Sequence, residues 1–165
     1  MRKLVGAACA VLLMSVAAPA MAQDGLEGSI SYASVDADGV ELGAVVGNLS
    51  WRSSNFIGLE GELGFGVSDD DVAPGVTAEL NTVFGAYVTA TADINENFAV
   101  FGRVGFAAAD AESNTGIDLG DEGLAYGAGA KFFLDGVNGL RLDYTKYDFD
   151  NGEADVWMIG YVRRF

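Results

Sequence analysis

Apolar and polar residues alternate along most of the chain after residue 27, which is the period of a β-strand with two different faces. The clearest case is residues 56–68. One face of that segment carries Ile57, Leu59, Leu63 and Phe65, and the other carries Glu60 and Glu62 between glycines. The same reading predicts eight strands, at residues 28–35, 41–52, 56–68, 79–92, 97–109, 123–134, 138–148 and 155–165.

The connections between these strands alternate between short and long. Those at 53–55, 93–96 and 135–137 are short, and those at 36–40, 69–78, 110–122 and 149–154 are longer. An even number of strands with short turns at one end and longer loops at the other is typical of a barrel that crosses a membrane. We therefore predict an all-β fold, an eight-stranded antiparallel up-and-down transmembrane β-barrel.

Charged residues in the middle of strands decide which face is inside. If the apolar face of each strand meets lipid, six charged side chains point into the barrel, all in its short-turn half: Glu60, Glu62, Arg103, Lys131, Arg141 and Asp143. Charges of opposite sign inside a narrow barrel can pair, whereas in an apolar core they would be costly. We predict that these six form a structural ion network, with Glu60 and Glu62 paired to the three bases.

A soluble sheet with its charged face in water is the alternative. It explains Glu60 and Glu62 equally well. It explains less well why the mid-strand charges are balanced in sign while most other acids gather in the four longer connections. A soluble protein of this kind would also be recovered without detergent.

The first residues predict export from the cytoplasm. Arg2 and Lys3 precede an apolar run that ends in Ala20-Met-Ala22, the pattern of a secretory signal peptide cleaved after Ala22. We expect residues 1–22 to be the signal peptide and residues 23–165 to be one barrel domain. Cys9 lies too early for a lipoprotein signal.

Charge and residue types exclude several functions. All 24 acidic residues but only seven of the nine Lys and Arg follow Ala22, a net charge of −17, so we expect no nucleic-acid binding. The chain has no histidine, which excludes a Ser-His-Asp hydrolase and a His-ligated zinc site. We expect no enzyme activity, cofactor or metal. Asp69–Asp71 and Asp148–Glu153 lack the spacing of a calcium loop and read as a solvated acidic rim.

The last strand adds a more specific signal. Trp157, Ile159, Tyr161 and the terminal Phe165 alternate, which looks like the C-terminal insertion signal of outer-membrane barrels, although Arg163 departs from it. Together with NFIGLEGELGFG, NFAVFGRVGF, LAYGAGAKFF and LRLDYTKYDF, this strand makes residues 26–165 resemble the small porin-like outer-membrane barrels of the OmpA/OmpX type. The resemblance implies a Gram-negative outer-membrane location, and its fold is the predicted one.

This location implies a structural role in envelope integrity, with acidic loops exposed for surface contact or adhesion. A narrow or gated pore for small solutes is the first alternative, and a soluble periplasmic barrel that binds a ligand is the second. Expected partners are outer-membrane lipid and lipopolysaccharide, the barrel assembly machinery, and a host or surface ligand of the acidic loops. We expect a monomer.

Overall fold

The computed structural model describes residues 25–37, 40–53, 56–67, 69–73, 76–113, 121–149 and 152–165. The expected signal peptide lies outside them. Nine strands run along the described chain: β1 (Leu26–Ala37), β2 (Val40–Arg52), β3 (Ile57–Gly66), β4 (Asp69–Ala73), β5 (Val76–Asp93), β6 (Phe98–Ser113), β7 (Asp121–Phe133), β8 (Asn138–Phe149) and β9 (Gly152–Arg164). Within the described ranges, no helix is long and apolar enough to cross a bilayer.

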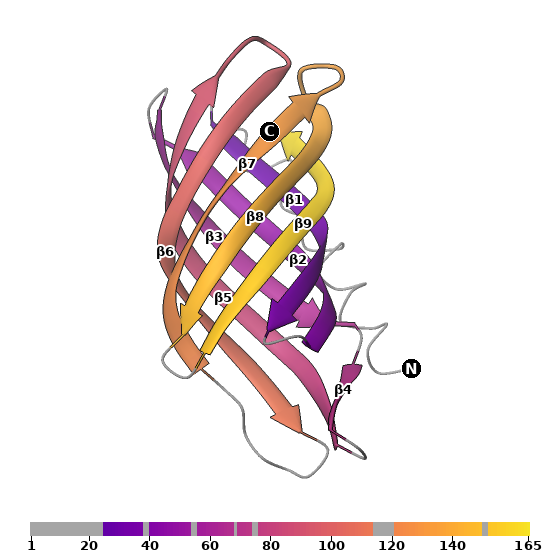
Figure 1. Ribbon diagram of the computed structural model, residues 1–165. Coiled ribbons are helices and arrows are strands. Elements are labelled where there is room, and N and C mark those ends of the chain that lie inside the picture. The colour runs from indigo at the N-terminus through magenta and orange to yellow at the C-terminus, as the bar shows by residue number, and fades with distance from the viewer. Residues whose placement is uncertain are drawn as a thin grey trace.

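The strands form a closed antiparallel barrel (Figure 1). Neighbours in sequence are neighbours in the sheet, β1 pairs with β9, and β3 pairs with β5 to complete the ring. β4 does not occupy a separate position in the barrel wall, because it pairs only with β5, beyond the point where β3 ends. The barrel wall therefore has eight strand positions, which confirms the predicted fold class.

Strands at one end of the barrel are longer than the alternation predicts. Residues 69–78 were expected to be a loop, yet β4 and the start of β5 form an antiparallel ladder there. Likewise β1 and β2 pair as far as Ala37 and Val40, and β8 and β9 pair as far as Phe149 and Gly152. The physical reason is that a ladder continuing past the lipid needs only backbone pairing, so its residues need not alternate apolar with polar.

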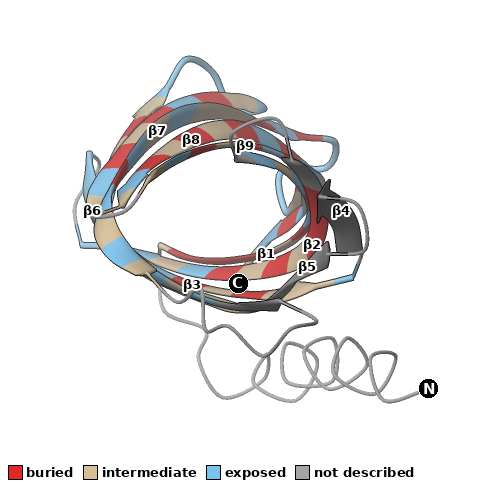
Figure 2. Cartoon of the chain, turned by 60° about the horizontal axis from the view of Figure 1, so that its bottom comes forward, coloured by how far each residue is buried: buried red, intermediate tan, exposed pale blue. Residues whose placement is uncertain are grey.

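Where side chains are described, their exposure alternates along the strands as the sequence pattern predicts (Figure 2). In β3, Ile57 and Leu59 are exposed on the outer face, whereas Glu60 and Glu62 are buried in the lumen. The middle band of the outer face is apolar, and Phe106 is 72% exposed there. An apolar outer wall around a polar interior is the arrangement that suits lipid outside the barrel.

We call one end of the barrel the short-turn end. It contains the turns between β2 and β3, between β5 and β6, and between β7 and β8. The opposite end is the loop end. In the turn after β7, Gly136 takes a φ of 78°, which favours glycine. The Asp135 carboxylate accepts hydrogen bonds from the backbone amides of Val137 and Asn138. These bonds hold the pKa of exposed Asp135 below its ordinary value, and they shape the turn.

Candidate functional site

The lumen contains a cluster of five charged side chains, which we call the central ion cluster: Glu60, Glu62, Arg103, Arg141 and Asp143. β3 supplies both glutamates, β6 supplies Arg103, and β8 supplies Arg141 and Asp143. Among the eight strand positions of the barrel wall, β3 and β8 are four positions apart. They therefore lie on opposite sides of the lumen. Their inward side chains therefore meet near the barrel axis.

Arg103 is the centre of this cluster. Its Nη1 lies 2.9 Å from Glu60 Oε1 and 2.7 Å from Glu62 Oε2, and its Nη2 lies 3.3 Å from Asp143 Oδ1. Its Nε donates to Thr145 Oγ1 at 2.9 Å. One guanidinium thus bridges three carboxylates that come from opposite walls.

Arg141 completes the cluster from β8. It donates to Glu60 at 2.7 and 2.9 Å through its two terminal nitrogens, a bidentate pair. Its Nε lies 2.7 Å from Asp143 Oδ2 on the same strand. Arg141 and Asp143 are each only 1% exposed, so the pairing takes place away from bulk water.

Neutral polar groups add hydrogen bonds to the two glutamates of the cluster. Glu62 Oε1 accepts hydrogen bonds from the hydroxyls of Tyr87 at 3.0 Å and Tyr147 at 2.7 Å, and Oε2 accepts from Asn48 at 2.9 Å. Ser50 donates to Glu60 at 2.6 Å. Buried charges are tolerated when their remaining hydrogen-bonding positions are filled in this way.

Lys131 is the predicted member that lies elsewhere. It contacts Glu27 rather than Glu60 or Glu62, and its ammonium group lies 4.9 Å from the centre of the Phe101 ring. Arg141, which belongs to the central ion cluster, also lies against this ring, with its guanidinium carbon 4.7 Å from the ring centre. Phe101 therefore contacts one cation from each of two separate ionic groups.

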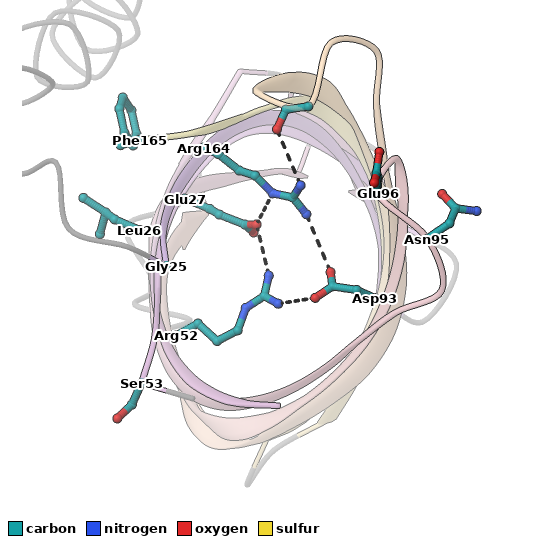
Figure 3. Close-up of a pocket in the computed structure, with 11 residues that line it drawn as sticks. Gly25, Leu26, Glu27, Arg52, Ser53, Asp93, Asn95, Glu96, Arg164 and Phe165 are labelled. Carbon is teal, nitrogen blue, oxygen red and sulfur yellow. Dashed lines mark hydrogen bonds and ion pairs between the residues drawn. The ribbon is translucent and has the colours of Figure 1, made fainter. Parts of the chain in front are cut away.

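The second group lies nearer the short-turn end, and we call it the mouth cluster: Glu27, Arg52, Asp93, Lys131 and Arg164. Figure 3 shows all of these residues except Lys131. Glu27 is its centre, with Arg164 Nε at 3.1 Å and Arg52 Nη2 at 3.3 Å. Arg52 also pairs with Asp93 at 2.7 Å. The sequence reasoning missed four of these residues, although buried Glu27 shares the inward parity of Ser29 and Ser31.

A cavity of about 880 Å³ lies at the mouth cluster, bounded in part by Arg52, Asp93 and Arg164. Figure 3 shows these side chains converging from different strands across the opening. Deeper in, the Arg164 guanidinium stacks on Phe133, 3.5 Å from the ring centre. The two clusters are complementary in charge: three acids against two bases in the central ion cluster, and two acids against three bases at the mouth.

The C-terminal series lies on the outer wall. Trp157, Ile159 and Tyr161 are 58%, 60% and 42% exposed on β9. The backbone amide of Phe165 donates to the carbonyl of Leu26 at 2.9 Å, which extends the pairing of β9 with β1 to the last residue. These four residues therefore present one apolar edge of the closing strand.

The acidic stretches are described only in part. The side chains of Asp69–Asp71 and the residue Asp150 lie outside what is described, and Glu153 pairs with Lys146 at 2.5 Å. Among the described residues no three His, Cys, Asp or Glu side chains are grouped as metal ligands.

Solved structures resemble this barrel. The attachment invasion locus protein Ail of Yersinia pestis aligns with a TM-score of 0.64 at 18% identity, covering 86% of this chain and 97% of that one. OprG from Pseudomonas aeruginosa aligns with a TM-score of 0.61 at 12% identity, over 86% and 96%. Neisserial surface protein A aligns with a TM-score of 0.62 at 12% identity, over 85% and 96%. At these identities the likeness shows the fold alone.

A comparison with curated protein sequences found no match. The family model of the outer membrane protein beta-barrel domain, in contrast, matches residues 7–165. This match covers nearly the whole chain and supports the outer-membrane location that the resemblance implied. The chain belongs to the outer membrane protein beta-barrel domain family.

Proposed function

We propose that this protein is a non-enzymatic outer-membrane barrel with a structural role in envelope integrity, and that its acidic loop end makes contacts at the cell surface. The observation that carries the structural role is the lumen filled by the central ion cluster. The expected signal peptide, residues 1–22, would bring the chain to the periplasm, and residues 23–165 would form the barrel.

Three layers obstruct the lumen along its axis. The central ion cluster joins β3, β6 and β8 across the barrel, with Arg103 3% and Arg141 1% exposed. Phe101 lies against its short-turn side, and the mouth cluster follows. A conducting pathway would have to break several buried ion pairs at once, which is costly. This arrangement supports a filled barrel over the narrow or gated pore.

The mature protein is expected to conduct no ions as folded. Refolded protein in planar lipid bilayers should give no stable single-channel steps at moderate voltage, because the ion pairs close the lumen. A known porin reconstituted in the same way is the positive control. Reproducible steps from several preparations would favour the alternative of a narrow or gated pore.

The positions of the basic residues limit which class of molecule can bind at the loop end. One of the solved structures shows Ail in complex with the heparin analogue sucrose octasulfate. In the present chain six of the seven bases after Ala22 lie in the short-turn half. Only Lys146 lies toward the loop end, where Glu153 pairs with it at 2.5 Å. We infer that the surface partner is neutral or basic, and that lipopolysaccharide phosphates would be reached through divalent cations rather than lysines.

Sucrose octasulfate is accordingly expected not to bind. Calorimetric titration of the refolded protein should give no heat above dilution at physiological salt, because acids repel the sulfates at the loop end. Ail measured under the same conditions is the matched control. Binding in the micromolar range would contradict the charge argument and would point to a basic site formed by Lys146.

Assembly is proposed to depend on the C-terminal series Trp157, Ile159, Tyr161 and Phe165, recognised by the barrel assembly machinery. Deleting Phe165 should lower the amount of protein in the outer membrane severalfold while changing the free energy of unfolding of refolded protein little. The reason is that Phe165 adds only one backbone bond to the β1–β9 pairing. Fractionation of cells, with Phe132→Ala as a control for loss of an outward aromatic residue, would measure the effect. Unchanged outer-membrane levels would contradict the insertion signal.

A further inference from the structure

Arg163 differs from the other bases of the described chain in having no acidic partner there. The other six bases after Ala22 each lie within ion-pair distance of a carboxylate: Arg52, Arg103, Lys131, Arg141, Lys146 and Arg164. Within the described ranges, no ion pair or hydrogen bond engages the Arg163 guanidinium, whose only close contact is an aromatic ring. An unpaired base needs a reason in a chain that has a net charge of −17 after Ala22.

Arg163 lies on the outer wall of the barrel, near the short-turn end. The alternation that turns Arg164 into the mouth turns Arg163 outward, where it is exposed. Trp51 and Tyr161, each 42% exposed, belong to the same end of the outer wall. Aromatic residues in such positions mark the level of the lipid headgroups, and the short turns of outer-membrane barrels face the periplasm. Arg163 is therefore at the headgroup level of the periplasmic leaflet, which consists of phospholipid.

The neighbours of Arg163 hold its guanidinium against the wall. Its partner on β1 is Gly28, which brings no side chain to this face. The Phe165 ring covers that position, since a Cβ atom on Gly28 would lie 3.1 Å from Phe165 Cε2, and Figure 3 shows Phe165 outside the barrel wall. The Arg163 guanidinium carbon lies 5.9 Å from the centre of the same ring. This cation–π contact orients the guanidinium and uses none of its N–H groups.

Asn138 adds a second polar group beside the guanidinium, as the partner of Arg163 on β8. Its Oδ1 accepts a hydrogen bond from the Tyr161 hydroxyl, and its Nδ2 donates to Asp135 Oδ2 at 2.7 Å. A side-chain amide has two N–H groups, so one of them remains as a donor. Together with the five N–H groups of the guanidinium, it suits an anion that has several oxygen atoms.

We propose that Arg163 binds the phosphate group of a phospholipid in the periplasmic leaflet, with the Phe165 ring against the adjoining part of the lipid. A guanidinium can donate two parallel hydrogen bonds to one phosphate group, whereas an ammonium group acts as a point charge. The stem of Arg163 covers the apolar wall while its charged end reaches the headgroups. The site therefore gives a reason for a base at a position where the C-terminal insertion signal departs from its usual pattern.

Lipids with a net negative charge are the preferred ligands of this site, because no cation of their own competes for the phosphate. The contact is local. The acidic chain as a whole would repel anionic lipid, so a preference for it cannot come from a general attraction.

Solid-state NMR tests the contact. The protein is labelled with ¹⁵N at arginine and refolded in vesicles of phosphatidylglycerol and phosphatidylcholine, and the dephasing of the guanidinium nitrogens by lipid ³¹P is measured. One of the five arginine signals should be dephased strongly. Arg163→Lys, which keeps the charge and removes the labelled guanidinium, should abolish this dephasing. Absent dephasing, or dephasing unchanged in Arg163→Lys, would overturn the proposal.

Lipid selection is the second arm, and it uses a different variant. In native mass spectrometry from an equal mixture of the two lipids, the ratio of bound phosphatidylglycerol to bound phosphatidylcholine should fall about fivefold in Arg163→Gln. Lys146→Gln removes the same charge at the loop end and should leave the ratio unchanged. Equal falls in both variants would show a general charge effect and would contradict a specific site.

Inorganic phosphate distinguishes a lipid site from a site for free anions. The protein refolded in a phosphorus-free detergent is titrated with phosphate while the Nε–H signal of Arg163 is followed. We expect no saturable shift, because the acidic chain repels free phosphate and no lipid tail holds it at the wall. Saturation at millimolar phosphate would assign the site to a soluble anion and would overturn the lipid proposal.

Discussion

Replacing Arg103 by methionine is expected to destabilise the barrel by about 3–5 kcal/mol, because it leaves buried charges without their partner. Arg103 lies 2.9 Å from Glu60, 2.7 Å from Glu62 and 3.3 Å from Asp143. Without it, three buried carboxylates share the single guanidinium of Arg141. The free energy of unfolding, measured by urea titration of protein refolded in lipid vesicles, gives the effect directly.

A double-mutant cycle identifies the partner. Adding Glu62→Gln to Arg103→Met should recover part of the loss, since the amide removes the stranded charge and still fills the space. Glu27→Gln is the matched control, because Glu27 is equally buried but belongs to the mouth cluster and pairs with Lys131, Arg52 and Arg164. Its effect should add to that of Arg103→Met within about 0.5 kcal/mol. If the two single-mutant effects also added within about 0.5 kcal/mol in the Arg103–Glu62 cycle, Arg103 and Glu62 would not interact.

The face of each strand was predictable because side chains alternate with period two and lipid accepts only one face. That reasoning places Glu60 and Glu62 opposite the exposed Ile57 and Leu59, and the structure has them there. It also applies to Arg103 on β6, between the exposed residues of that strand. Where one face is buried and the other meets lipid, a shift by one residue would move every charge into the membrane.

The choice of partner was not predictable in the same way. Alternation and distance from a turn give the face and the approximate height of Lys131, but pairing across a lumen depends on the stagger of the strands around the barrel. That stagger brings Lys131 to Glu27, a residue placed before the first expected strand, and not to Glu60 or Glu62. The prediction that Glu60 and Glu62 pair with Lys131 was wrong for this reason.

Residues near chain ends and turns were missed for a related reason. Asp93 and Arg164 stand at strand boundaries, where solvent exposure is the ordinary expectation for a charge. In the barrel both point across the mouth, where Arg164 pairs with Asp93 and Arg52 reaches Asp93 from β2. The inward parity of Glu27, continued by Ser29 and Ser31 on β1, was the one signal in the sequence that would have found the mouth cluster.

Replacing Gly160 by alanine is expected to cost about 3 kcal/mol, near the upper end for overpacking a fixed site. A Cβ atom on Gly160 would lie 2.1 Å from the carbonyl oxygen of Ile30 and 2.3 Å from Ser31 Oγ. Both residues belong to β1, which pairs with β9 to close the barrel. Because the first contact is with backbone, the two strands themselves would have to separate, and their ladder hydrogen bonds would lengthen.

Gly61→Ala is the matched control for this change. Gly61 lies on the outer face of β3, and a Cβ atom there would meet nothing within 4 Å. Both substitutions reduce the freedom of the unfolded chain equally, so the difference between them isolates the clash in the folded barrel. Urea titration in lipid vesicles should show Gly61→Ala neutral or stabilising by up to about 1 kcal/mol. Ser31→Ala added to Gly160→Ala should recover little, since the contact with the Ile30 carbonyl remains. Equal stability of the Gly160 and Gly61 variants would show that β1 and β9 do not approach this closely at the closing seam.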